Sequence, residues 1–224
     1  MSKKANPIIQ SWKINAKKWI KTIENSEIES RQLITNTTIL NNVLQRKPKS
    51  VLDIGCGEGW LVNTLVKQEI QAMGIDAIAA LIKNAKTKGK GKFKVITYDT
   101  LTKGATFKQA PFELITINFA LFENRKTKQL IKKLPNYLTA DGQIIIQTLH
   151  PFSIAKDKRY ESAWRKDSWE GLKRNFQQPH KWYFRTLEDW IKLFSKAKLN
   201  LLELQEPIHP KTGRPASVVF VLGK

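Results

Sequence analysis

Three glycines and two aspartates in the first half of the chain have residue types and a spacing that could bind a ligand. Gly55, Gly57 and Gly59 directly follow an apolar run, and glycines at such a turn let the backbone bend sharply and approach a ligand closely. Asp53 places a carboxylate at the end of that run, and Asp76 ends the next one. Asp76 follows Gly55 by about 20 residues, the spacing at which an acid can hydrogen-bond ribose hydroxyls. The pattern indicates a nucleotide-binding turn between a strand and a helix.

The glycine spacing and the acidic residue of this turn indicate which kind of nucleotide it could bind. The dinucleotide fingerprint G-x-G-x-x-G directs a helix amino terminus at a pyrophosphate, whereas this turn reads G-x-G-x-G. The carboxylate of Asp53, two residues before the first glycine, would repel a phosphate but would suit a ligand with a positive amino group. The turn therefore favours a nucleoside with a cationic tail.

The segment from Asp53 to Gly59 resembles motif I of the class I S-adenosylmethionine-dependent methyltransferases. The resemblance covers roughly residues 48–150 and resumes near residue 186. It implies S-adenosylmethionine as the cofactor, Asp76 as the acid that binds the ribose, residues 98–100 as the segment that meets the adenine, and residues 111–121 as the fourth strand and the turn below the methyl donor. The cofactor-binding residues that it implies are Asp53, Gly55, Cys56, Gly57, Asp76, Ala77, Tyr98, Asp99, Thr100, Asn118 and Phe119.

Plainer interpretations of the same residues compete with this one. Three spaced glycines can form a tight strand-to-helix connection without a ligand, but here the turn, the ribose acid and the order of the strands agree. An NAD-binding dehydrogenase is disfavoured by the glycine spacing. Cys56 could be a nucleophile, yet a small residue between two motif glycines is expected to pack beneath the ligand.

The length and composition predict one α/β unit with an appendage. The chain has 224 residues, of which 41% are hydrophobic, enough for a well-buried core. We expect an N-terminal helical cap over residues 1–47 and a methyltransferase domain over residues 48–224 with an insertion at 151–185. The single cysteine excludes an intramolecular disulfide. The N-terminus resembles no signal peptide and no segment approaches the ~18–20 apolar residues of a membrane span, so a cytoplasmic location is expected.

Alternating strand and helix patterns predict a Rossmann-like sheet with helices on both faces. Residues 7–23 and 27–45 carry apolar side chains at helical spacing, so two amphipathic helices precede the sheet. Strands and helices then alternate over residues 51–149, which requires parallel strands with right-handed crossovers. The turn at residues 139–142 is expected to stop the helix before the fifth strand.

The C-terminal region predicts a different strand pairing. Strands are expected at residues 199–205 and 217–222, with only a loop between them, and a parallel return would need a crossover of about a dozen residues. The pair should therefore be antiparallel, which completes the mostly parallel seven-stranded sheet that the methyltransferase resemblance implies.

Residues 151–185 interrupt the alternation and are rich in aromatic side chains. Connections at the carboxyl ends of parallel strands border the ligand crevice, so this insertion could form a cap over the site with Trp12 and Trp19 of the N-terminal helices. The alternative is a small satellite hydrophobic cluster that only tethers the insertion.

His150 is the candidate catalytic residue, because it ends the fifth strand beside the expected crevice and an imidazole has a suitable pKa for a general base. A histidine that hydrogen-bonds the backbone at a strand end is the alternative. His180 and His209 lie in predicted loops, and nothing in the sequence places either at the donor. The three histidines and one cysteine lack metal-ligand spacing, so no metal is expected. Arg31 and Arg185 could bind a carboxylate on the donor or the acceptor, but surface roles are the default expectation for each.

The acceptor is only partly indicated. Asn118 is not followed by the prolines typical of enzymes that methylate exocyclic amines of bases, which counts against adenine or cytosine N-methylation. The C-terminal half, with the segments 150–151, 182–188 and 206–210, is similar to bacterial small-molecule methyltransferases near the ubiquinone and menaquinone methylases, which implies a small-molecule acceptor. The net charge of +20 could instead attract a phosphate backbone, so an RNA methyltransferase is the alternative. The sequence indicates no oligomeric state.

Overall fold

A twisted sheet forms the centre of the computed structural model, which describes residues 6–155, 159–166 and 168–224. Its strands are β1 (Ser50–Ile54), β2 (Gln71–Asp76), β3 (Lys92–Val95), β4 (Phe112–Asn118), β5 (Leu138–Leu149), β8 (Asn200–Gln205) and β9 (Ser217–Gly223). The strand order is β3-β2-β1-β4-β5-β9-β8, and only the pairings of β9 with β5 and β8 are antiparallel. The predicted Rossmann-like, mostly parallel seven-stranded sheet with an antiparallel C-terminal hairpin is confirmed.

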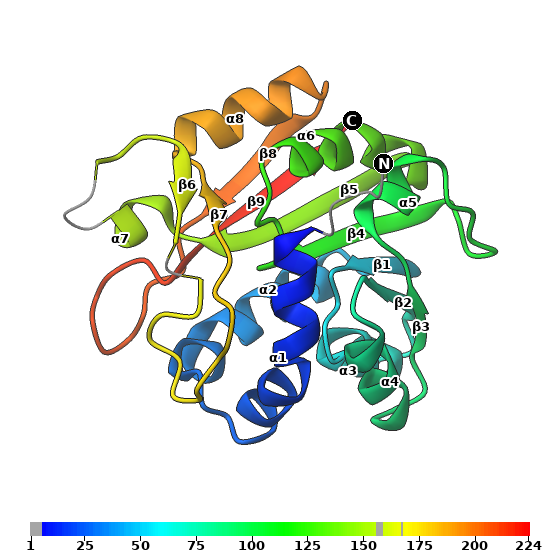
Figure 1. Cartoon of the computed structure of the whole chain (residues 1–224). Helices are drawn as coiled ribbons and strands as arrows, with labels where there is room; N and C mark the ends of the chain where they lie inside the picture. Colours follow the sequence, from blue (N-terminus) through cyan, green and yellow to red (C-terminus); the bar gives the residue numbers. More distant parts are fainter. Residues whose placement is uncertain (1–5, 156–158, 167) are drawn as a thin grey trace, which may run out of the picture.

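Helices cover both faces of this sheet (Figure 1). They are α1 (Pro7–Glu24), α2 (Asn36–Gln45), α3 (Trp60–Lys67), α4 (Ala79–Thr87), α5 (Tyr98–Thr102), α6 (Arg125–Lys133), α7 (Pro151–Ala155) and α8 (Leu187–Lys196). A π-helical segment, Arg31–Thr35, precedes α2, and a 3-10 turn, Leu134–Tyr137, follows α6. Helices α5, α6 and α8 pack on one face, and α2, α3 and α4 pack on the other. None of the helices in these ranges is long and apolar enough to cross a membrane.

The two cores follow from the alternation of side chains along each strand. In β4, Leu114 points to the core under α2 and α3, whereas Ile115 and Ile117 point to the core under α6 and α8. Ile145 and Ile146 divide in the same way in β5. Strands that are buried on both faces read as continuous apolar runs, which is why these segments are identifiable from sequence.

Parallel pairing brings the carboxyl ends of three strands to one edge of the sheet. Asp53 in β1 pairs in register with Gly74 in β2 and with Thr116 in β4. The residues that end the neighbouring strands, Asp76 and Asn118, therefore lie beside Asp53 at this edge. The fold thus gathers residues that are far apart in the sequence.

The prediction that a turn at residues 139–142 stops the helix is wrong. Strand β5 already begins at Leu138, which pairs with Phe112, while Gln143 pairs with Leu114. The four residues between Leu138 and Gln143 form an irregularity within the strand instead of stopping the helix. Helix α6 ends earlier, just before Pro135, because proline has no amide hydrogen to continue the helical hydrogen bonds.

The insertion contains short elements that the sequence pattern did not reveal. Besides α7 it forms β6 (Ala163–Arg165) and β7 (Trp182–Phe184), which pair antiparallel as a separate two-stranded sheet. Three-residue strands are too short to show a period of two, so no pattern could predict them. In Figure 1 the insertion runs alongside α1, and Asn15 of α1 accepts a hydrogen bond from the backbone N–H of Gln177 over 2.8 Å.

Candidate active site

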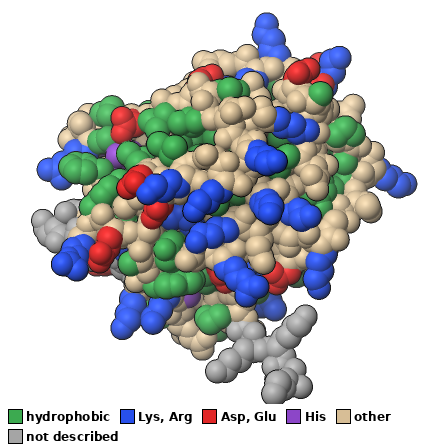
Figure 2. All heavy atoms as spheres, turned by 90° about the horizontal axis from the view of Figure 1, so that it is seen from above, with side chains coloured by type: hydrophobic (Ala, Val, Ile, Leu, Met, Phe, Trp, Pro, Cys, Tyr) green, Lys and Arg blue, Asp and Glu red, His purple; other side chains and the backbone are tan. Residues whose placement is uncertain are grey.

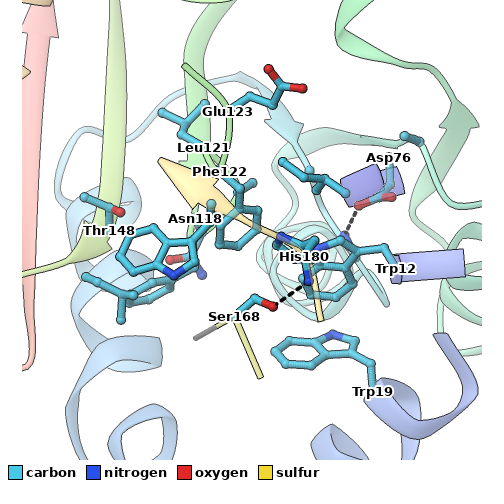
Figure 3. A pocket seen from close by; sticks show the side chains of 18 of the residues that line it. Trp12, Trp19, Asp76, Asn118, Leu121, Phe122, Glu123, Thr148, Ser168 and His180 are labelled. Atoms are coloured by element: carbon cyan, nitrogen blue, oxygen red, sulfur yellow. Dashed lines mark hydrogen bonds between the residues drawn. The ribbon is translucent and has the colours of Figure 1, made fainter. Parts of the chain in front are cut away.

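A cavity of about 1050 Å³ opens at the carboxyl ends of β1, β2 and β4, and α1 and the insertion close its other side. Figure 3 shows part of its wall. Among the described residues, Thr100 and His150 are the predicted site residues that do not line this cavity. The predicted residues that do line it are Asp53, Gly55, Cys56, Gly57, Asp76, Ala77, Tyr98, Asp99, Asn118 and Phe119.

The glycines of the turn are required by close packing as well as by backbone conformation. Gly55 has a φ of +75°, and a Cβ atom on it would lie 2.4 Å from the Cβ of Ala120. Gly59 has a φ of +79°, and a Cβ atom there would lie 2.6 Å from the ring of Phe93. An L side chain is therefore strained at both positions and has no room. The turn lies directly against the loop after β4, which narrows the cavity floor.

Asp53 is buried at the base of the cavity. The hydroxyl of Thr116 donates a hydrogen bond to its carboxylate over 2.8 Å. The pKa of Asp53 is raised to about 7, mainly by burial and in addition by the nearby carboxylates of Glu58 and Asp76, while the hydrogen bond from Thr116 acts in the opposite direction. Without a ligand, the carboxyl of Asp53 is thus only partly ionised at neutral pH.

Asp76 is held by two backbone amides. The N–H groups of Gly57 and Ile78 donate to its two carboxylate oxygens over 3.0 and 2.8 Å. Burial raises the pKa of Asp76 to about 6, although these two hydrogen bonds lower it. The carboxylate has a fixed orientation, and lone pairs on both oxygens remain for a ligand.

Glu58, which the sequence analysis did not single out, joins the turn to the N-terminal helices. Its carboxylate accepts a hydrogen bond from the indole N–H of Trp19 over 3.1 Å and forms an ion pair with Arg31 at 3.3 Å. The guanidinium of Arg31 lies 6.0 Å from the ring of Trp19 and 5.7 Å from that of Trp60. The surface role expected for Arg31 is therefore wrong. In the sequence, the one local sign of this contact is the position of Glu58, an acidic residue between two glycines of the motif.

The charges in this part of the cavity fit S-adenosylmethionine. Asp53, Glu58 and Asp76 bring three carboxyl groups together, and of these Glu58 is the one paired with Arg31. The raised pKa values of Asp53 and Asp76 mean that their negative charges are not fully compensated. A ligand with sulfonium and ammonium charges would compensate them, whereas a pyrophosphate would add to the repulsion.

The loop after β4 is strained and lies under the same part of the cavity. Phe119 has a φ of +49°, an unfavourable conformation for a residue with a side chain. The hydroxyl of Tyr98 donates to the backbone carbonyl of Ala120 over 2.9 Å, and burial keeps this phenol neutral by raising its pKa. The buried Oδ1 atom of Asn118 has no hydrogen-bond partner among the described residues. Such strain and unused polar groups are typical of ligand sites.

Cys56 is buried against β2, where its sulfur would meet a Cβ atom on Gly74 at 2.7 Å. Burial raises the pKa of its thiol, and the carboxylates of Asp53 and Asp76 add to this effect. The thiolate needed for a nucleophile is therefore disfavoured, as expected for a residue packed beneath the ligand.

Four aromatic side chains, Trp12, Phe122, Trp169 and His180, form a group on the opposite side of the cavity, which we call the aromatic cluster. Trp12 lies 4.8 Å from Trp169 and 6.0 Å from Phe122, measured between ring centroids. His180 lies 5.5 Å from Trp169 and 6.0 Å from Phe122. The indole N–H of Trp169 donates to the hydroxyl of Ser11 over 3.0 Å. The insertion and α1 thus pack together over the cavity.

His150 is buried and turned toward the C-terminal loop. Its Nε2 forms a hydrogen bond of 2.7 Å with the carboxylate of Glu206, and its Nδ1 accepts the N–H of Ser153 over 3.4 Å. Both ring nitrogens are occupied, and the ring is outside the described cavity wall. The predicted catalytic role of His150 therefore has no support from its position.

Arg185 is also buried, contrary to the surface role expected for it. Its guanidinium lies between the rings of Tyr183 and Trp190, at 4.8 and 5.0 Å, and donates to the backbone carbonyls of Glu123 and Asn124. Burial lowers its pKa to about 10. Two aromatic faces and two carbonyls compensate for the lost hydration of the charge. The arginine thus fixes the loop after β4 against the insertion.

Comparisons with known proteins agree with this site. A family model described as a methyltransferase domain matches residues 28–204. An uncharacterised protein of Haemophilus influenzae is 24% identical over 201 residues, which are 81% of this chain and 79% of that protein. A candidate tRNA methyltransferase of Mycoplasma pneumoniae is 41% identical over 58 residues, which are 26% of each chain.

A solved structure shows the same fold over the whole length. The 1,6-didemethyltoxoflavin-N1-methyltransferase of Burkholderia thailandensis, crystallised with 1,6-didemethyltoxoflavin and S-adenosylhomocysteine, superposes with a TM-score of 0.64. The match covers 100% of this chain and 92% of that one, at 15% identity. The family match spans most of the chain. The chain belongs to the class I methyltransferase-domain family, whose enzymes use S-adenosylmethionine as the methyl donor.

Proposed function

We propose that this enzyme transfers the methyl group to a small, planar or apolar acceptor that lies against the aromatic cluster. The observation that carries this proposal is the aromatic cluster, which lies beside the proposed cofactor residues in the wall of a cavity of about 1050 Å³. A site for one drug-sized ligand is typically ~300–1000 Å³, so this cavity has room for a cofactor and a second small molecule. The proposal agrees with the resemblance to small-molecule methyltransferases near the ubiquinone and menaquinone methylases.

The residues of the first three strand ends would hold the cofactor. Asp53 would attract its ammonium group, Asp76 would accept hydrogen bonds from its ribose hydroxyls, and Asp99 lies where the adenine is expected. Asn118 has a buried carbonyl oxygen free to accept a hydrogen bond from the ligand. When bound, S-adenosylmethionine supplies an activated methyl group on a sulfonium centre.

The enzyme's own contribution is to orient the acceptor and to exclude water. Alignment of two reactants in a closed site can lower a barrier by ~7–11 kcal/mol in favourable cases. The aromatic cluster presents flat apolar faces, which suit a planar acceptor and offer few dipoles that would stabilise the charged ground state. The contacts of α1 with the insertion close this side of the site, so both segments are needed for the acceptor region.

Methylation of RNA is the second candidate function. Helix α6 carries Arg125, Lys126, Lys128, Lys132 and Lys133 and no acidic residue. Figure 2 shows Lys and Arg side chains spread over the face of the molecule that includes α6 and α8, and Lys126 also lines the cavity. The Mycoplasma pneumoniae relative points in the same direction. Against this candidate, the aromatic cluster lies in the cavity wall beside the proposed cofactor residues, where its flat faces suit a planar small molecule.

One experiment separates the two candidates. The purified enzyme is incubated with methyl-labelled S-adenosylmethionine and with either a bacterial extract filtered to small molecules or total bacterial RNA. We expect label in the small-molecule fraction and none in the RNA. Label confined to RNA would contradict the proposal and favour the second candidate.

Binding of the cofactor is measured in parallel by calorimetry. We expect Asp53→Asn and Asp76→Ala to weaken the binding of S-adenosylmethionine, while Asp141→Asn, on the exposed surface of β5, leaves it unchanged. Unchanged affinity in both cavity variants would overturn the assignment of the cofactor site.

A further inference from the structure

His180 is a buried histidine in the cavity wall, and neither the fold nor the cofactor site accounts for it. Its side chain is 4% exposed, and it lies just before β7 in the insertion. The backbone N–H of His180 donates to the hydroxyl of Ser168 over 3.0 Å, and its ring packs on Phe122 and Trp169. Figure 3 shows His180 in the middle of the residues that face the cavity. The ring therefore has a fixed position in the acceptor region.

A hydrogen bond of the Nδ1 atom determines the tautomer of the His180 ring. Nδ1 lies 3.1 Å from the backbone carbonyl of Lys181. A carbonyl can only accept, so Nδ1 carries the hydrogen and the neutral ring has its lone pair on Nε2. No described residue forms a hydrogen bond with Nε2 of His180. Burial lowers the pKa of His180, while the Lys181 carbonyl acts in the opposite direction, so the ring is neutral at pH 7.

None of the other titratable groups around the cavity is joined to the ring of His180 by a hydrogen bond or an ion pair in the described part of the chain. On the acceptor side, the carboxylate of Glu123 accepts a hydrogen bond from Asn6 over 2.8 Å. Lys13, Glu170 and Lys126 also line this cavity, and no ion pair or side-chain hydrogen bond joins any of them to the ring of His180 within the described residues. On the donor side, Asp53, Glu58 and Asp76 hold the cofactor region.

We propose that His180 is the general base of the reaction and removes the proton from the acceptor atom that is methylated. The inference rests on the proposed function, and it names the acceptor class as a planar molecule with an acidic O–H or N–H group. The proton of that group moves to Nε2 of His180. The electron pair of the broken O–H or N–H bond forms the new bond to the methyl carbon, and the electrons of the carbon–sulfur bond remain on sulfur. The imidazolium then returns its proton to water.

His180→Gln tests the role, because glutamine keeps a polar side chain of similar length and cannot act as a base at neutral pH. His209→Gln is the matched control. His209 belongs to the loop between β8 and β9, lies near Glu29, and is outside the described cavity wall. Transfer of label from S-adenosylmethionine to the small-molecule extract is measured between pH 5.5 and 8.5. We expect His180→Gln to lower the rate about 100-fold at pH 7 and the control to leave it unchanged.

Three further readouts separate a chemical role from a structural one. Affinity for S-adenosylmethionine should be the same in His180→Gln and wild type. At saturating S-adenosylmethionine, where the pH dependence of cofactor binding has no effect, the wild-type rate should rise with pH as His180 loses its proton, and this rise should be absent in the variant. Nitrogen chemical shifts of the imidazole in the ligand-free protein should report the hydrogen on Nδ1.

The outcomes are distinguishable. If wild type labels the extract and His180→Gln does so at a similar rate with the same pH profile, the base role is wrong and the proposed function remains. A neutral ring with its hydrogen on Nε2 would overturn the role as well. If wild type binds S-adenosylmethionine but labels no small molecule, the proposed function fails, and the role of His180 fails with it.

Discussion

The backbone N–H of Gly57 donates to the carboxylate of Asp76 over 3.0 Å, so the glycine turn after β1 directly orients the acid at the end of β2. The N–H of Ile78 donates to the other oxygen of the same carboxylate. Two parts of the cofactor site are therefore one hydrogen-bonded unit. A change in either part should alter the other.

The first prediction concerns Asp76. Asp76→Ala removes the acceptor for the ribose and also leaves the N–H groups of Gly57 and Ile78 without a partner. Hydrogen bonds to charged groups contribute about 1.5–3 kcal/mol, so we expect the affinity for S-adenosylmethionine to fall about 10-fold to 150-fold. Calorimetry at pH 7.5 measures this loss. Asp76→Asn keeps one carbonyl oxygen and should bind with intermediate affinity. Equal affinities for the two variants would argue against a contribution of the carbonyl oxygen that Asp76→Asn retains.

The second prediction concerns pH and Asp53. The pKa of Asp53 is raised to about 7 in the ligand-free protein, so this group is mostly protonated at pH 6 and mostly ionised at pH 7.5. Only the ionised form attracts the ammonium group of the cofactor. We expect the affinity for S-adenosylmethionine to rise about 5-fold to 10-fold from pH 6 to pH 7.5.

Asp53→Asn is the control for this pH dependence. The amide has a similar shape but does not titrate, so the variant should bind weakly and its affinity should change less between the two pH values. The residual dependence includes that of Asp76, whose pKa is raised to about 6. A variant with the full wild-type pH dependence would exclude Asp53 as its cause.

The third prediction concerns the packing of the glycine turn. Gly55→Ala places a Cβ atom 2.4 Å from that of Ala120 and forces a side chain into a positive φ. We expect the free energy of unfolding to fall by about 2–4 kcal/mol, measured by urea denaturation. Gly104→Ala is the matched control, because Gly104 has a φ of +95° and no neighbouring atom within 4 Å. It should lose only about 1 kcal/mol. Equal losses would show that the clash with Ala120 is relieved at no cost.

The fourth prediction concerns the contact between the N-terminal helices and the turn. Glu58→Ala leaves the guanidinium of Arg31 buried without its carboxylate, and we expect a loss of about 3 kcal/mol in stability. The double variant Arg31→Met, Glu58→Met removes both charges and should recover most of this loss. As a control for an exposed pair, Glu188→Ala, which breaks the ion pair with Lys192 in α8, should lower the stability far less than Glu58→Ala does. A double variant as unstable as Glu58→Ala would argue against the ion pair as the cause.

The fifth prediction concerns His150. Its hydrogen bond with Glu206 at 2.7 Å joins the end of β5 to the C-terminal loop. We expect His150→Gln to change the rate of methyl transfer by less than about twofold and to lower the stability by about 1 kcal/mol. Labelled transfer to the small-molecule extract and urea denaturation measure the two effects. A large loss of rate with unchanged stability would restore His150 as a catalytic residue.

The residues at the strand ends that line the cavity, which we propose hold the cofactor, could be brought together from the sequence because their signals are local. Gly55, Gly57 and Gly59 are spaced by two, and Asp53 and Asp76 each end an apolar run. Such runs are strands, and parallel strands place their carboxyl ends at the same edge. Thr100 is the exception, because its backbone and hydroxyl contact the hydroxyl of Thr97, which caps α5, instead of the cavity.

The acceptor half could not be predicted in the same way. His150 and His180 are equally plausible bases by residue type, and the structure separates them because Glu206, 56 positions away, binds the first. Arg31 meets Glu58 from a distance of 27 positions. No sequence period or motif predicts contacts between residues that lie so far apart in the chain.

The sequence by itself determined the succession of strands along the chain, the glycine turn, and the acids Asp53 and Asp76 at the ends of two apolar runs, because glycine spacing and apolar runs are local properties of the chain. Tertiary structure alone decided which histidine and which arginines lie in the cavity. Their burial depends on partners from α1, the insertion and the C-terminal loop, and the free energy of those contacts exists only when the segments have packed together.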